Sequence, residues 1–116
     1  MTNATMQKFL VLYLIPVQVM QAWMETSPEA RQTEEETMRA DWVKWTQAHS
    51  ASILSNEAVG KNKSVSASGV VDAKNDIVLA SIVEGTSHDA VSHMFIDHPH
   101  FRIPQASIEI MPIRPM

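Results

Sequence analysis

The stretch Phe9-Leu-Val-Leu-Tyr-Leu-Ile15 is apolar at every position, and the run Ile77-Val-Leu-Ala-Ser-Ile-Val83 is apolar at all positions but one. Both runs are rich in branched and aromatic residues, which favour β-strands. A strand that is apolar on both faces is typical of a sheet buried on both sides. The two runs therefore predict strands of a sheet that needs cover on each face.

The first predicted helix begins at Ser27-Pro-Glu29, which combines an N-cap residue, a proline at the first helical position and an acid in the first turn. A stripe at spacings of four, three and four residues follows on one face: Met38, Trp42, Trp45 and His49. Glu34-Glu-Glu36 marks the solvent side. Before this helix, the rough helical spacing of Val17, Met20 and Met24 predicts a short helical turn.

A second helix is expected after the second apolar run. Thr86-x-x-Asp89 resembles a capping box and would start it, and Pro99 ends it because proline cannot continue the hydrogen-bonded ladder. Its predicted apolar face consists of Ala90, Val91, Met94 and Phe95.

The remaining segments predict further strands. Residues 53–59 and 107–112 each form a short run with strand character, and residues 64–71 alternate with a period of two, which predicts one twisted or edge strand. The polar segments 60–63 and 72–76 have the composition of turns.

The predicted order is β-α-β-β-α-β, with an extra strand or hairpin arm in the middle, in one domain over residues 1–116. Two helices on one side of a mostly antiparallel sheet form the ferredoxin-like α+β arrangement. Two short helices cover only one face of the sheet. We therefore expect a homodimer in which a second copy covers the other face.

Composition excludes several classes of protein. The net charge is −4 and the nine Lys and Arg residues are scattered, which argues against nucleic acid as a partner. Without cysteine, the chain has no disulfide, thiolate metal site or cysteine nucleophile, and it fits a reducing cytoplasm. Only three glycines are present, and neither a phosphate-binding loop nor a hydrolase or zinc-protease motif occurs. We expect neither a cofactor nor a metal.

The apolar run after Lys8 has roughly the length of a signal-peptide core. Only one positive charge precedes it, and no small-x-small cleavage site follows before Trp23. It is also shorter than the about 20 residues that span a bilayer. We therefore interpret it as a buried strand of a cytoplasmic protein with no membrane partner.

Asp97-His98-Pro-His100 is the best candidate for chemistry. Imidazoles titrate near neutral pH and transfer protons or bind metals, and an aspartate can orient one of them. In the alternative interpretation, both rings form a hydrogen-bonded cap that ties the end of the helix to the last strand. A zinc site would need a third ligand, such as Glu109 or His49, to converge on them.

The stripe of Met38, Trp42 and Trp45 would suit the wall of a pocket for a flat or apolar ligand, and it suits plain core equally. Glu109 lies within the last predicted strand. If its side chain faces the helices, Glu109 is a buried carboxylate. It would then be a substrate-binding residue and a possible general base. If it faces outward, it pairs with a cation such as Arg102.

Several segments, taken in order, resemble the YCII-related family and its DGPF-type branch. They are Lys8-Phe-Leu-Val-Leu-Tyr13, Trp42-x-x-Trp45, Ile82-Val-Glu84, Ser87-x-Asp-Ala90, Asp97-His-Pro-His-Phe101 and Ser107-Ile-Glu-Ile-Met-Pro-Ile113. The match covers most of residues 8–116. The resemblance implies a dimeric α+β barrel with a pocket between sheet and helices in each subunit.

Members of the YCII branch carry a histidine early in the first helix and an aspartate before a proline after the second, and one relative is a dehydrochlorinating enzyme. In this chain, the first-helix region holds Met38, Arg39 and Trp42, and His98 precedes the proline, with Asp97 one residue earlier. The family's acid–base pair is therefore not carried over to these positions.

Two functions follow from the residues. In the first, the chain is a small enzyme with cofactor-free, lyase- or isomerase-like acid–base chemistry on an apolar or aromatic metabolite, with His98 or His100 as the acid–base group. In the second, it is a non-catalytic dimeric module that binds a small molecule or a protein, and the histidines are structural. An open pocket touching His98 and Trp42 would favour the first.

Overall fold

A computed structural model describes residues 5–116. The elements in chain order are β1 (Gln7–Leu14), α1 (Val17–Met24), α2 (Pro28–Ala48), β2 (Ile53–Ala58), β3 (Asn62–Ser66), β4 (Gly69–Ala73), β5 (Ile77–Gly85), α3 (His88–Met94), the 3-10 helix η1 (Pro99–Arg102) and β6 (Ser107–Pro112). Within these residues, no helix is both long and apolar enough to cross a membrane.

The main sheet has four strands in the order β2-β5-β1-β6, and every neighbouring pair is antiparallel. Without the β3–β4 hairpin and the short helices α1 and η1, the chain runs β-α-β-β-α-β, so the predicted ferredoxin-like α+β fold is confirmed. The two apolar runs form the central strands β1 and β5. The more polar β2 and β6 lie at the edges, where one side of each strand remains free of partners.

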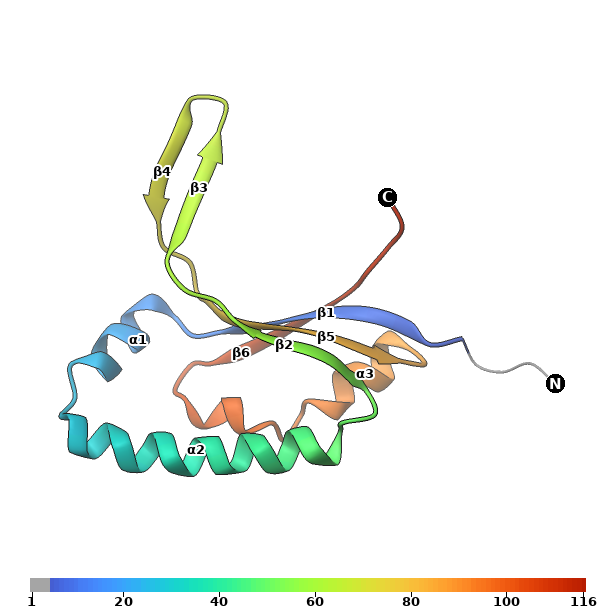
Figure 1. The fold of residues 1–116 in the computed structure, drawn as a ribbon, viewed down its shortest axis with the longest axis horizontal. Coiled ribbons are helices and arrows are strands. Elements are labelled where there is room, and N and C mark those ends of the chain that lie inside the picture. Colours follow the sequence, from blue (N-terminus) through green and yellow to red (C-terminus); the bar gives the residue numbers. More distant parts are fainter. Residues whose placement is uncertain (1–4) are drawn as a thin grey trace.

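The core lies between the sheet and the helices. In Figure 1, α2, α3 and η1 lie on one side of the sheet. Alternate residues of β1 point toward them and are buried. The core cluster consists of Phe9, Val11, Tyr13, Trp45, Val83, Val91 and Phe95. One face of the sheet is thus fully covered within the single chain.

The opposite face of the sheet is also apolar. Leu10 and Leu12 of β1 pair in register with Ile82 and Ala80 of β5, so all four side chains lie on the same face, and all are half-buried. Figure 1 shows no helix over this side of the sheet. We call these four residues the bare sheet face.

The prediction of a single strand over residues 64–71 is wrong, and the alternative of a hairpin arm in the middle of the chain is confirmed. The chain reverses at Ala67-Ser68 and pairs β3 with β4 in a separate two-stranded hairpin. Gly69 takes a φ of 135° at this reversal, a conformation that residues with a Cβ rarely adopt. The predicted turns are correspondingly shorter, because β3 begins at Asn62 and β4 continues to Ala73.

This hairpin forms an arm that projects on the side of the sheet away from α2 (Figure 1). Val65, Val70 and Val71 are 75%, 61% and 63% exposed on it. An isolated two-stranded hairpin is only marginally stable in water. The arm therefore adds an uncovered apolar surface to that of the bare sheet face.

The helix starts follow the predicted chemistry, with one correction. The Ser27 hydroxyl accepts a hydrogen bond from the Ala30 N–H at 3.3 Å, as expected of an N-cap. The N-cap of α3 is Ser87 and not Thr86, because the Ser87 hydroxyl accepts a hydrogen bond from the Ala90 N–H at 3.0 Å. Ala90 itself is exposed, so it does not belong to the predicted apolar face.

Replacing Phe9 by alanine is expected to lower the free energy of unfolding by about 3–5 kcal/mol, because it leaves a cavity beneath the helices. Phe9 is fully buried and its ring stacks on His88 with centroids 5.6 Å apart. Urea denaturation measures the loss. Val65→Ala on the exposed arm is the matched control and should change stability by less than about 0.5 kcal/mol. Equal losses in the two variants would contradict this location of the core.

Candidate functional site

His98 lies at the exit from α3 and begins η1. Its backbone N–H donates to the Phe95 carbonyl at 3.1 Å. Its ring Nδ1 accepts a hydrogen bond from the His100 backbone N–H at 2.9 Å, and Pro99 occupies the first position of η1. The side chain of His98 is only 2% exposed. The imidazole thus serves as the N-cap of a 3-10 turn and lies in the interior.

His100 joins this turn to the sheet. Its Nε2 lies 3.0 Å from the Leu14 carbonyl oxygen and 3.1 Å from the Ser107 carbonyl oxygen. Both oxygens only accept, so Nε2 carries the proton and donates to them. Leu14 and Ser107 are cross-strand partners in β1 and β6. One imidazole therefore holds the ends of two strands and η1 together.

Aromatic rings surround His98 from three elements. Its ring centroid lies 4.3 Å from that of Trp42 and 4.4 Å from that of Trp45, both on α2. Tyr13 of β1 follows at 5.5 Å and Phe95 at 5.7 Å. The structure thus brings together four of the predicted site residues: His98, His100, Trp42 and Trp45. We call these four residues the histidine–tryptophan cluster.

Burial controls the protonation of the cluster. The pKa of His98 is lowered from 6.5 to about 4, mainly by desolvation and also by His100 and His49, while Asp97 opposes the change. Burial also lowers the pKa of His100, although its hydrogen bonds to the Leu14 and Ser107 carbonyls raise it in part. Both imidazoles are therefore neutral at pH 7.

The hydrogen bonds of His98 limit its chemistry. A neutral imidazole has one lone pair available on a ring nitrogen, and in His98 the Nδ1 lone pair accepts the His100 N–H. The proton then lies on Nε2, which is buried and has no hydrogen-bond partner among residues 5–116. The Trp45 indole N–H is likewise buried and has no hydrogen-bond partner among these residues. The site thus presents two buried donors and has no free base at His98.

A second polar group lies beside the cluster and was not predicted. Ser81 is 1% exposed, and its hydroxyl lies 3.1 Å from the Tyr13 hydroxyl and bonds the side chain of Asn56. Burial raises the pKa of Tyr13, and the hydrogen bond with Ser81 opposes that rise in part. The signal in the sequence is that Ser81 is the one polar residue in the apolar run 77–83.

The side chains of the remaining predicted site residues are not buried with the cluster. Asp97 is exposed. Glu109 is exposed and pairs in register with Leu12, so it belongs to the opposite face of the sheet. Arg102, which we considered as a partner for Glu109, forms an ion pair with Asp41 on α2 at 2.7 Å.

His49, which we considered as a third metal ligand, is held by α2. Its Nδ1 lies 2.7 Å from the Trp45 carbonyl oxygen, and its ring stacks on the Trp45 indole with centroids 4.1 Å apart. No group of three side chains able to hold a metal ion occurs within the described part of the chain.

Met38 lines a cavity of about 650 Å³ between α1, α2 and the segment after η1, which we call the α1–α2 cavity. Its wall is mainly apolar. The lining residues are Ile15, Val19, Met20, Ala22, Trp23, Met24, Thr26, Glu34, Glu35, Met38, Arg102, Ile103 and Pro104. No residue of the histidine–tryptophan cluster belongs to this lining.

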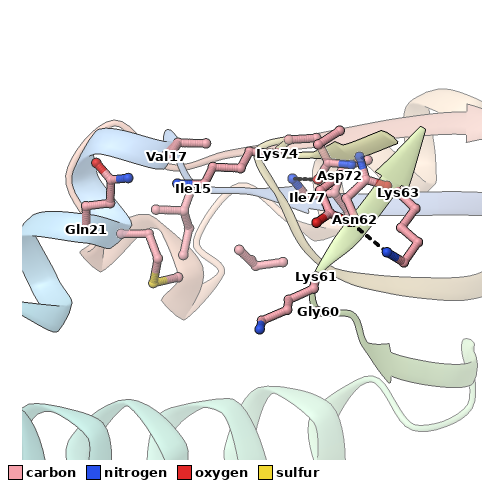
Figure 2. Close-up of a pocket in the computed structure, with 14 residues that line it drawn as sticks. Ile15, Val17, Gln21, Gly60, Lys61, Asn62, Lys63, Asp72, Lys74 and Ile77 are labelled. Carbon is pink, nitrogen blue, oxygen red and sulfur yellow. Dashed lines mark hydrogen bonds and ion pairs between the residues drawn. The ribbon is translucent and has the colours of Figure 1, made fainter. Parts of the chain in front are cut away.

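A second cavity, of about 630 Å³, lies between α1 and the base of the arm (Figure 2), and we call it the arm-base cavity. Ile15 and Met20 line both cavities. The cluster does not line this one either. The sequence gives no motif for either cavity, because each is assembled from separate segments.

Comparison with known proteins yields no family model and no curated protein that matches this chain. Among solved structures, the chain is similar to 5-chloro-2-hydroxyhydroquinone dehydrochlorinase from Burkholderia phenoliruptrix AC1100 in complex with 2,5-dihydroxybenzoquinone. The two share 16% identity and a TM-score of 0.46 over 88% of this chain and 90% of that chain. A likeness at this level assigns neither activity nor ligand, and membership of the YCII-related family stays a prediction from the sequence motifs.

The depressed pKa of His98 makes stability depend on pH. Between about pH 6.5 and pH 4 the unfolded chain binds a proton on His98 that the folded chain does not. The free energy of unfolding should therefore fall by roughly 2–3 kcal/mol as the pH drops through this window. His98→Asn keeps an acceptor for the His100 N–H and should remove this contribution. Urea denaturation at several pH values measures it.

The comparison is between the slopes of stability against pH in the variants and in the unaltered chain. The exposed His93 provides a control, and His93→Asn should keep the slope of the unaltered chain. If His98→Asn and the unaltered chain lose stability equally between pH 6.5 and 4, His98 is not buried in the neutral form.

Proposed function

We propose that the protein binds a small apolar or aromatic molecule in the α1–α2 cavity and that the buried histidines support the fold without taking part in catalysis. The carrying observation is the cavity itself. Its volume of about 650 Å³ is in the range of small-molecule sites, roughly 300–1,000 Å³. Its wall is apolar and has charged groups only at a few positions.

The side chains of the wall suit a flat or irregular apolar ligand. Met20, Met24 and Met38 contribute thioethers from α1 and α2. Methionine is flexible and polarisable, and it adapts to ligands of different shape. Trp23 adds a large planar surface for stacking. These residues favour recognition by shape and dispersion over recognition by specific hydrogen bonds.

The geometry of the histidines supports the non-catalytic interpretation. An acid–base residue must reach the reacting group within hydrogen-bond distance or through one water. His98 and His100 are each 2% exposed, and neither lines the two cavities. The Nδ1 of His98 and the Nε2–H of His100 are both engaged by the backbone. Cofactor-free lyase- or isomerase-like chemistry would need a group that faces the ligand.

We further propose that two copies pair through the bare sheet face to form the dimeric α+β barrel implied by the resemblance to the YCII-related, DGPF-type family. Leu10, Leu12 and Ile82 offer an apolar surface that no helix covers. The arm stands on the same side, so a second copy would also approach its exposed valines. The absence of cysteine suits a reducing cytoplasm, which we propose as the compartment.

Ligand binding can be tested with 1-naphthol, a small aromatic probe, by isothermal titration calorimetry. Met38→Glu places a carboxylate in the apolar wall and should weaken binding at least about tenfold, because burying an unpaired charge is costly. Val43→Glu is the matched control: Val43 lies on the same helix, is 50% exposed and does not line the cavity. Equal affinity of the two variants, or no saturable binding by the unaltered chain, would contradict the proposal.

The dimer can be tested by light scattering at micromolar concentrations. We expect a mass of twice the 13.0 kDa chain, and a shift toward 13.0 kDa or unfolding for Leu12→Asp, which puts a charge in the middle of the bare sheet face. Val43→Asp on the far side of α2 should leave the mass unchanged. A mass near 13.0 kDa for the unaltered chain across this range would contradict the dimer.

A further inference from the structure

The arm-base cavity is not used by the proposed function, and its chemistry differs from that of the α1–α2 cavity. It lies where α1, the start of β5 and the two ends of the arm meet. Ile15, Ile77 and Val78 contribute apolar side chains from the sheet. Lysines come from the base of the arm on the other side (Figure 2). The cavity therefore has one apolar wall and one basic wall.

The basic wall carries an excess of positive charge. Lys61, Lys63 and Lys74 line the cavity, and Asp72 is the one acidic residue in the lining. Asp72 is already paired, since its Oδ1 lies 2.6 Å from the Lys63 Nζ. Neither Lys61 nor Lys74 forms an ion pair with a carboxylate of residues 5–116. This excess is opposite in sign to the net charge of −4 of the chain.

One carboxylate beside the lining, that of Asp76, is already bound by a backbone N–H of the cavity wall. Asp76 Oδ1 accepts a hydrogen bond from the Val17 N–H at 3.2 Å, at the first residue of α1. A carboxylate in this position is favoured by the partial positive charge of the helix N-terminus. In Figure 2 the side chain of Lys61 extends away from the arm into the open space on the side of α2. Its ammonium group is thus accessible to a ligand.

We propose that the arm-base cavity binds a small organic anion, namely a carboxylate with an apolar body. The apolar part would lie against Ile15, Ile77 and Val78, where its burial removes apolar surface from water. The carboxylate would lie between the ammonium groups of Lys61 and Lys74, in charge-assisted hydrogen bonds. An inorganic anion would interact favourably only with the basic wall, and a neutral apolar molecule only with the apolar wall.

The test compares three probes on the unaltered protein: octanoate, 1-octanol and acetate. Octanoate offers both a carboxylate and an apolar body, and each of the other two lacks one of them. We expect saturable binding of octanoate by calorimetry, and at least about tenfold weaker binding of both 1-octanol and acetate. 1-Octanol loses the charge-assisted hydrogen bonds, and acetate loses the burial of the apolar body. In a ¹⁵N-labelled sample, octanoate should shift the amide signals of Lys61, Ala73 and Lys74.

The double variant Lys61→Gln/Lys74→Gln should reduce octanoate affinity about tenfold and leave 1-octanol binding unchanged. Lys44→Gln on α2, outside both cavity linings, is the matched control and should keep the affinity of the unaltered chain. Both lysines of the double variant are exposed, so folding should survive, and the amide spectrum verifies it.

Three results would overturn the proposal: equal affinity for octanoate and 1-octanol, equal affinity for octanoate and acetate, or an unchanged octanoate affinity in the double variant. Shifts confined to Val19 and Trp23, which line only the α1–α2 cavity, would also overturn it and would support the proposed function instead. Conversely, if Met38→Glu failed to weaken naphthol binding, the inference about the arm-base cavity would stand.

Discussion

The two central strands of this fold carry apolar side chains on both faces, and the other layers are arranged around this constraint. Phe9, Val11 and Tyr13 on one face of β1 are covered by helices of the same chain. Leu10 and Leu12 on the other face are not. Burial of apolar surface is the main favourable term in folding, so an uncovered apolar face calls for a further layer. A second copy of the sheet would supply it.

The helix layer depends in turn on two imidazoles that form hydrogen bonds with the backbone. His100 donates to carbonyls of β1 and β6, and His98 accepts from the backbone of the turn between them. Trp42 and Trp45 of α2 pack against His98, so α2 is joined to this turn through aromatic contacts. Neutral histidines suit such a role because their burial does not remove a charge from water. The two histidines therefore support the packing of the helices on the sheet.

The sequence predicted those features that depend on local chemistry. The apolar runs identified both central strands, and Ser27 identified the start of α2. A hairpin arm was one of two alternatives, but the position of the reversal at Ala67-Ser68 was not predicted, because the alternation of serine and apolar residues continues through it. The facing of Glu109 was left open, because a strand alternates equally well in either orientation and only its register with Leu12 decides it. Both cavities depend on how α1 packs, which its short, weakly patterned sequence does not determine.

The central claim, that the bare sheet face meets a second copy, can be tested most directly with spin labels. The chain has no cysteine, so Glu109→Cys gives a single label on that face, and Glu35→Cys gives one on α2. Sheets packed face to face lie about 10 Å apart. Dipolar spectroscopy should therefore detect a shorter distance between labels at position 109 than between labels at position 35. No dipolar coupling at position 109, or a longer distance there than at position 35, would contradict the account.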